Sequence, residues 1–263
     1  MPGKLILIGG GEVKRNCDDC KSQLLAQIFR GQDIKRTTVI FPPSDEKQKG
    51  VRKYQQVFKK ITGNLPHFIL LEENSKTTET DIEKIKKTDL IYFGGGQQKK
   101  YMEGLSSDFI KEVQNRFHND NVLIAGTSAG AMIFSDKIIA EGSNAESRLN
   151  DELDMLPGIN LLPNFIIDTH FIQRSRFARL AHAIKRHPNH IGLGIEANSA
   201  LFFENEHIAK CYGDGPITIV DGSNIQIKTL SEKDSVFNLT VHLLAAGCTI
   251  DFKNLKQMCS PNG

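Results

Sequence analysis

The chain has 263 residues, of which 39% are hydrophobic and 24% are charged, and its formal net charge is +2. These ordinary globular values exclude a fibrous or largely disordered chain, and the near balance of charge excludes the basic excess that nucleic-acid binding requires. We expect a single α/β domain spanning residues 1–263, because one domain of this length is common in that class.

The start of the chain predicts a β-strand and no targeting segment. Lys4 precedes a short apolar run that is too brief for a signal-peptide core and lacks a small-residue cleavage site. No stretch approaches the roughly 18 apolar residues that a membrane span needs, and the five cysteines lack the spacing of a disulfide framework. We therefore expect a cytoplasmic protein with reduced thiols and no membrane contact.

Short apolar runs alternate with segments of helical spacing along the first two-thirds of the chain. Several of the runs end in glycine or proline, and together they have the character of buried parallel strands. They cover 5–11, 37–43, 67–71, 89–96, 121–130 and 190–196. The segments between them predict helices at 21–30, 46–61, 80–87, 106–118 and 174–186. This alternation predicts a mainly parallel sheet with helices on both faces. From about residue 199, closely spaced short strands predict an antiparallel extension of the same sheet.

The predicted strand at 121–130 contains a serine in a glycine-flanked turn. Gly126 and Gly130 lie two residues either side of Ser128, and a helix-compatible segment follows. This is the G-x-S-x-G elbow in its strand–turn–helix context, where the glycines let neighbouring backbone approach closely. We predict that Ser128 is a nucleophile and that the N–H of Ala129 stabilises an oxyanion. The alternative is that the small residues only allow close packing of strand and helix.

A second glycine-rich turn follows the apolar run at 89–93. Three consecutive glycines at 94–96 can turn their backbone N–H groups into a concave anion site. Gly95 and Gly96 would then supply the second oxyanion donor, and the alternative is a phosphate site. The Lys-Ser/Thr of a P-loop is missing, and the glycine triplet at 9–11 lacks the GxGxxG spacing, so the sequence disfavours a nucleotide.

The segment 165–180 places a histidine among several convergent polar groups after an apolar run. His170 is the only one of the eight histidines in such a setting, and we predict that it is the general base for Ser128. Glu196 ends a later predicted strand at the same sheet edge, which makes it the preferred acid to orient His170. Asp168 is the alternative acid, two residues away on the same strand face. The order Ser-His-acid argues against an α/β-hydrolase.

Three arginines follow the histidine at a spacing that one helical stripe does not explain. Arg174 and Arg176 diverge by about 200° on a helix, whereas these two and Arg179 at a helix start would surround a pocket. Because guanidinium groups form bidentate contacts with carboxylates, we predict that the arginines bind carboxylates of a substrate. Surface charge paired with the acidic residues at 141–154 is the alternative.

Four motifs, FGGGQQ, GTSAGA, DTHFIQRSRFARL and GLGIEANSA, follow one another in this order. Their order and intervals resemble the cyanophycinase branch of the serine peptidase family that also holds aspartyl dipeptidase, over roughly residues 4–225. The resemblance implies a class I glutamine amidotransferase-like, flavodoxin-like fold with serine in place of the usual cysteine. It also implies a homodimer and hydrolysis of β-aspartyl-arginine linkages in cyanophycin, with release of β-Asp-Arg dipeptides.

The resemblance also implies roles for individual residues. Ser128 and His170 match the nucleophile and the base. The arginines would hold aspartyl carboxylates and an acid in a loop would face the arginine of the substrate. The residues beside the substrate would be Gln98, Glu146, Asp168, Thr169, Arg174, Arg176 and Arg179. The family often has two consecutive acids where this chain has Glu196 followed by Ala197, so Glu196 and Asp168 both stay candidates for the third triad member.

Two other functions use the same sequence features. An aspartyl or isoaspartyl dipeptidase would keep the machinery and act on small peptides, and a non-catalytic binding protein would leave Ser128 idle. Cys17 and Cys20 have the CxxC spacing, but no second pair follows at zinc-finger distance, and His182 is not part of an HExxH pattern. We therefore expect neither a metal ion nor a cofactor.

Overall fold

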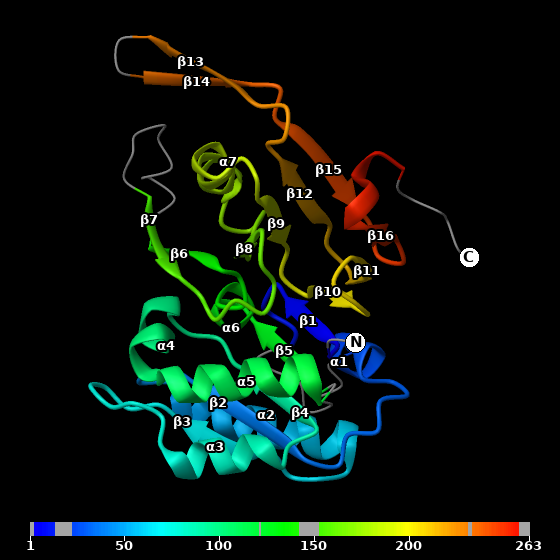
Figure 1. Ribbon diagram of the computed structural model, residues 1–263. Helices are drawn as coiled ribbons and strands as arrows, with labels where there is room; N and C mark the ends of the chain where they lie inside the picture. Colours follow the sequence, from blue (N-terminus) through cyan, green and yellow to red (C-terminus); the bar gives the residue numbers. More distant parts are fainter. Residues whose placement is uncertain (1–2, 14–22, 121, 142–152, 231–232, 258–263) are drawn as a thin grey trace.

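The computed structural model of the protein describes residues 3–13, 23–120, 122–141, 153–230 and 233–257 (Figure 1). Its largest element is an eight-stranded sheet with the order β16-β11-β10-β1-β5-β4-β2-β3. The first five strands of the chain pair in parallel, and the other three pair antiparallel at one edge. The strands are β1 (Leu5–Ile8), β2 (Thr37–Phe41), β3 (His67–Leu70), β4 (Leu90–Phe93), β5 (Leu123–Thr127), β10 (Ser199–Phe203), β11 (Ile208–Gly213) and β16 (Thr249–Asp251).

Helices cover both faces of this sheet, as the sequence predicts, because successive strand residues point to opposite faces. Along β1, Leu5 and Leu7 belong to one hydrophobic cluster and Ile6 and Ile8 to the other, and all four are completely buried. Burial on both faces explains the continuous apolar runs. The helices are α1 (Gln23–Ile28) and α2 (Lys47–Thr62) on the Ile6 face, and α3 (Glu79–Lys86) and α5 (Ser107–Asn119) on the Leu7 face.

A second sheet of four strands lies beside the first and corrects part of the sequence prediction. Its order is β15-β12-β9-β8, with β8 and β9 parallel and the other pairs antiparallel. The run at 190–196 thus lies outside the main sheet, and of the later strands in the described residues only β10, β11 and β16 extend that sheet. Apolar periodicity reports that a strand is buried but not which strand it pairs with. The strands are β8 (Phe165–Thr169), β9 (Ile191–Ile195), β12 (Ile217–Asp221) and β15 (Thr240–Leu244).

The remaining elements surround the second sheet and the turns of the first. Helix α7 (Phe177–Arg186) packs on β8, β9 and β12. Two hairpins are separate, and the one formed by β13 and β14 extends away from the body beyond α7 (Figure 1). No helix in the described part of the chain is long and apolar enough to cross a membrane. The other elements are β6 (Lys137–Glu141), β7 (Asp154–Pro157), β13 (Gln226–Leu230), β14 (Lys233–Phe237), α4 (Gln98–Gly104), α6 (Ala129–Met132) and η1 (Phe252–Gln257).

The two sheets share one hydrophobic cluster and meet at the carboxyl ends of their parallel strands. Leu7 of the first sheet and Ile167 and Leu193 of the second belong to the same cluster, which supports the proposal of a single domain. The backbone N–H of His170, after β8, donates to the carbonyl of Gly9, after β1, at 3.0 Å. Because ligand sites of open α/β sheets lie at the carboxyl ends of the strands, this junction is the expected place for the functional site.

Candidate active site

Ser128 occupies the sharp turn between β5 and α6. Its φ of 53° and ψ of −121° form a conformation that residues other than glycine rarely adopt. A Cβ on Gly126 would lie 2.3 Å from the carbonyl oxygen of Gly130, and one on Gly130 would lie 2.3 Å from that of Phe93. The glycines are therefore required by close backbone approach, and the strand, turn and helix expected around Ser128 are all present.

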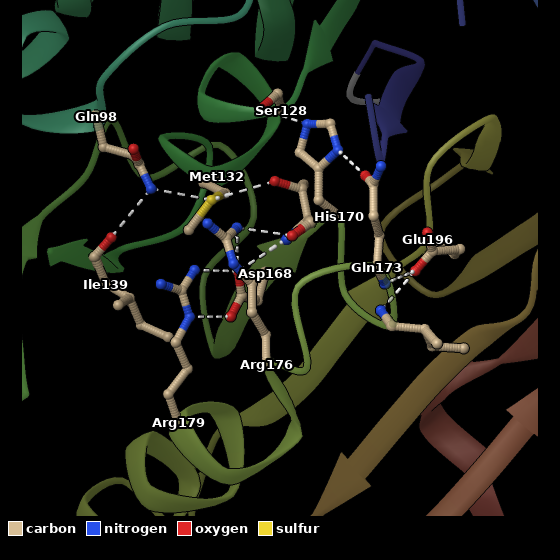
Figure 2. Close-up of polar contacts among 12 residues, drawn as sticks. Gln98, Ser128, Met132, Ile139, Asp168, His170, Gln173, Arg176, Arg179 and Glu196 are labelled. Atoms are coloured by element: carbon tan, nitrogen blue, oxygen red, sulfur yellow. Dashed lines mark hydrogen bonds and ion pairs between the residues drawn. The ribbon is translucent and has the colours of Figure 1, made fainter. Parts of the chain in front are cut away.

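His170 reaches Ser128 from the second sheet. Its Nε2 lies 3.2 Å from Oγ of Ser128, within reach for proton transfer (Figure 2). His170 itself has a φ of 49°, and its ring lies against the backbone of Gly10, where a Cβ would come within 2.3 Å of Nε2. The backbone of the β1 turn and the elbow thus confine the imidazole in a position from which it can accept the Ser128 proton.

The surroundings favour a neutral imidazole. Burial, and next the positive charge of Arg174, lower the pKa of His170 below the ordinary histidine value, and Arg176 acts in the same direction. The hydrogen bond to Gln173 and the negative charge of Glu12 oppose this shift without reversing it. A neutral ring at neutral pH keeps the free lone pair that a general base needs.

The second ring nitrogen of His170 contacts an amide. Nδ1 lies 3.1 Å from Oε1 of Gln173, a residue that the sequence analysis did not single out (Figure 2). Its position in the motif DTHFIQRSRFARL could have indicated this contact, because a tight turn brings the side chain three residues later back to His170. The turn is tight here, because the N–H of Arg174 donates to the carbonyl of His170 at 3.0 Å and Ser175 has a φ of 52°.

Glu196 follows β9 and lies at the edge where the sequence places it, but its contacts differ from those expected. Its Oε2 accepts a hydrogen bond from the backbone N–H of Ile172 and another, at 3.1 Å, from that of Gln173 (Figure 2). Within the described residues, no hydrogen bond joins Glu196 to His170. The carboxylate therefore holds the turn after His170 and does not touch the imidazole.

Asp168, the alternative acid, is completely buried and binds two arginines. Nη1 of Arg176 lies 3.1 Å from Oδ1, Nε of Arg179 lies 2.5 Å from Oδ2, and Nη2 of Arg179 also donates to Oδ1 (Figure 2). The backbone N–H of Thr169 adds a bond of 2.9 Å to Oδ1. A buried carboxylate needs such partners because an unpaired charge is costly in the protein interior.

This cluster changes the interpretation of the three arginines. The side chain of Arg179 is 4% exposed and that of Arg176 is 11% exposed, and both are directed to Asp168. Burial, and the nearby Arg179 and Arg174, lower the pKa of Arg176 to about 10, so it stays charged beside Asp168 at neutral pH. Arg174 alone of the three is exposed. Two of the three guanidinium groups thus pair with Asp168 and one is exposed, and contact of all three with a substrate stays a prediction.

Gln98 and Thr169 converge on one methionine. Nε2 of Gln98, at the start of α4, lies 3.0 Å from Sδ of Met132 and 3.3 Å from the carbonyl of Ile139. Oγ1 of Thr169 donates to the same sulfur at 3.4 Å, and Thr169 is completely buried (Figure 2). Gln98 is half-buried. Of Gln98 and Thr169, both predicted beside the substrate, Gln98 is therefore the more accessible.

The glycine turn after β4 lies against the nucleophile. A Cβ on Gly95 would be 3.7 Å from the Cβ of Ser128, and one on Gly96 would be 2.3 Å from Cγ of Pro42. The turn therefore comes close to Ser128 on the side of β4, while Ala129 follows Ser128 on the side of α6. This arrangement is compatible with the predicted oxyanion donors, which are the backbone N–H groups of Gly95, Gly96 and Ala129.

A buried carboxylate beneath the elbow escaped the sequence analysis. Glu12 is 4% exposed and accepts hydrogen bonds from the hydroxyl groups of Tyr54, Tyr92 (3.0 Å) and Thr127 (2.8 Å). Burial, and next the charge of Glu12, raise the pKa of both tyrosines well above the ordinary value, so both remain donors. Thr127 precedes Ser128, which links Glu12 to the elbow. The position of this acid, directly after the glycine triplet at 9–11, could have indicated that it lies near the site.

Three residues of the sequence analysis lie outside the described residues. They are Glu146, whose contact with substrate stays a prediction, and Cys17 and Cys20, for which no metal role is expected. Within the ranges that the structure describes, no group of three or more His, Cys, Asp or Glu side chains is arranged to hold a metal ion.

Comparisons with known proteins bear on the whole chain. The sequence model of peptidase family S51 matches residues 5–211. The chain is 33% identical over 257 residues to a cyanophycinase of Geminocystis herdmanii (strain PCC 6308), covering 94% of this chain and 93% of that protein. It is 25% identical over 252 residues to a cyanophycinase of Nostoc sp. (strain PCC 7120), covering 92% and 83%. The fold resembles the crystal structure of a peptidase from an acI-B1 Actinobacterium, with a TM-score of 0.63, 20% identity, and coverage of 96% and 98%.

Proposed function

This chain belongs to peptidase family S51 and is a serine-type peptidase, and we propose that it hydrolyses β-aspartyl-arginine linkages of cyanophycin and releases β-Asp-Arg dipeptides. The observation that carries the chemistry is the 3.2 Å contact between Oγ of Ser128, on its strained turn, and Nε2 of His170. The choice of substrate is supported by the relatives named cyanophycinase, one of them 33% identical over 94% of this chain.

The proposed reaction is acyl transfer to Ser128. Nε2 of His170 takes the hydroxyl proton as Oγ attacks the carbonyl carbon of the scissile amide, and backbone N–H groups of Gly95, Gly96 and Ala129 donate to the oxyanion. His170 then gives the proton to the leaving amine, and the C–N bond breaks. His170 then deprotonates a water molecule, which attacks the acyl ester, and the imidazolium returns the proton to Oγ of Ser128 as the ester C–O bond breaks.

Arg174 is the group we propose for binding a carboxylate of the substrate. It is exposed, and its charge is close enough to His170 to lower the pKa of the imidazole. A guanidinium in this position can form a bidentate contact with a carboxylate. Arg176 and Arg179 support the end of β8, directly before His170, by holding Asp168. The contact of Glu146 with the arginine of the substrate, the homodimer and the cytoplasmic location belong to the same proposal.

Purified protein incubated with cyanophycin tests this function. We expect β-Asp-Arg to appear by mass spectrometry, and we expect a fluorophosphonate to label the wild-type protein but not the Ser128→Ala variant. A protein that is labelled and cleaves free aspartyl dipeptides, but releases nothing from the polymer, would contradict cyanophycin as the substrate. The proposed serine chemistry would still hold. A wild-type protein that neither reacts with the fluorophosphonate nor hydrolyses either substrate would contradict the whole proposal.

A further inference from the structure

The hydrogen bonds of His170 identify which tautomer its ring adopts. The atom opposite Nδ1, at 3.1 Å, is the amide oxygen of Gln173, which can only accept a hydrogen bond. Nδ1 must therefore carry the hydrogen, which leaves Nε2 unprotonated and facing the hydroxyl of Ser128. This is the tautomer that a general base for Ser128 requires, and in this structure Gln173 is the side chain that binds its Nδ1–H.

We propose that Gln173 is the residue that positions His170, in the place where a serine triad usually has an acid, and that Glu196 acts on the site only through Gln173. The inference rests on the proposed Ser128–His170 chemistry and deepens it. In the described structure, the carboxylate of Glu196 is bonded to the backbone N–H groups of Ile172 and Gln173.

The backbone between the two residues explains how Glu196 supports this contact. Gln173 lies three positions after His170, and the chain reverses between them because the N–H of Arg174 bonds to the carbonyl of His170. Two consecutive N–H groups of this turn point at Glu196, whose carboxylate satisfies both. Holding the turn closed is what brings the side chain of Gln173 back to Nδ1 at the edge of the imidazole ring (Figure 2).

A neutral partner at Nδ1 has a consequence for the charge of the base. A carboxylate there would favour the imidazolium and raise the pKa of His170, whereas an amide orients the ring without adding charge. The charged groups that face His170 are Glu12 beneath the elbow, Arg174 and Arg176 on its own turn, and Glu196 beyond Gln173. Burial and the two arginines prevail, so the base remains unprotonated to a lower pH than one paired with an acid.

The experiment is the rate of fluorophosphonate labelling of Ser128 as a function of pH, which needs no knowledge of the substrate. In Gln173→Leu, which keeps the size but removes the acceptor, we expect labelling to slow by about 10-fold to 100-fold at all pH values. In Gln173→Glu we expect the acid limb of the profile to move up by about one pH unit or more, because a carboxylate then faces Nδ1. Gln173 is exposed, so both variants are expected to fold, and circular dichroism checks this.

Two further variants separate positioning from general effects. Glu196→Gln should slow labelling but leave the acid limb of the pH profile in place. The reason is that the carboxylate removed in this variant binds backbone N–H groups and not the imidazole. Gln226→Glu, an exposed position on the distant hairpin strand β13, controls for the added charge and should behave as wild type. The proposal is overturned if Glu196→Gln moves the acid limb while Gln173→Leu changes neither rate nor limb. If wild-type Ser128 is not labelled at all, the proposed serine chemistry itself fails, and this inference with it.

Discussion

The two halves of the site come from different sheets, and each contains a buried carboxylate with different partners. Beneath the nucleophile, Glu12 accepts from three hydroxyl groups, which are neutral. Beside the base, Asp168 accepts from the guanidinium groups of Arg176 and Arg179. The first half is therefore negatively charged and the second positively charged, and His170 lies between them.

The halves also differ in how they are held. The turn of Ser128 depends on backbone, because Gly126 and Gly130 leave no room for a side chain. A Cβ on Gly126 would meet the backbone of Gly130 in the same turn, and one on Gly130 would meet the backbone of Phe93 at the end of β4. The turn of His170 depends on side chains from distant positions, since Asp168 pairs with a residue 11 positions away and Glu196 reaches back 24 positions to Ile172. The comparison indicates that close packing of backbone positions the nucleophile, whereas hydrogen bonds and ion pairs of charged side chains position the base.

The largest expected effect tests whether the two halves act together. Ser128→Ala and His170→Ala should each lower kcat/KM by about 10⁴-fold to 10⁶-fold, because either change removes the covalent route. The double variant should be little worse than either single variant. Losses that multiply in the double variant would show that the halves contribute independently, which contradicts the proton transfer between them.

The second prediction concerns the charged cluster of the base half. Asp168→Asn leaves two buried guanidinium groups without their carboxylate and should lower the free energy of unfolding by about 3–5 kcal/mol. Asp108→Asn breaks an exposed pair with Lys111, whose side chains are 76% and 73% exposed, and should cost about 0–1 kcal/mol. Urea unfolding measures both. Equal free energies of unfolding for the two variants would show that Asp168 does not stabilise the fold.

The third prediction is directed at the joint between the halves. Gly10→Ala would place a Cβ 2.3 Å from Nε2 of His170, and displacing the ring should lower kcat/KM by about 100-fold. Gly11→Ala is the matched control, since its φ is also positive, at 72° against 98°, but its Cβ would meet only Ala197 at 3.4 Å and backbone at 3.7 Å. Equal activity losses in the two variants would mean that backbone strain, not contact with His170, is responsible.

The smallest expected effect sharpens the electrostatic comparison. The positive charge of Arg174 lowers the pKa of His170, so Arg174→Gln should raise that pKa and move the acid limb of Ser128 labelling to higher pH by less than about one unit. The same variant should raise KM for a β-aspartyl substrate if Arg174 binds its carboxylate. Arg52→Gln, at an exposed position on α2, serves as the control. An unmoved limb would show that Arg174 does not influence the base.

Several features could be predicted from the sequence because they depend on nearby residues. The alternation of apolar runs and helical segments predicted the parallel sheet covered on both faces, and β1 to β5 form it. The glycines around Ser128 predicted a sharp turn after a strand. The second sheet was not predicted, because β8 and β9 have the same apolar character as strands of the first sheet and periodicity carries no information on pairing.

By itself, the sequence determined the turn that carries Ser128 and the position of His170 directly after a strand, since apolar periodicity and the steric limits of the backbone are local properties. Only the tertiary structure decided the partners of the charged and polar side chains. An arginine such as Arg179 can pair with a substrate or with Asp168, and the choice was made when α7 packed on β8. Likewise, Glu196 contacts the turn of Gln173 because β9 lies beside β8. Separation along the sequence does not reveal that these two strands are neighbours.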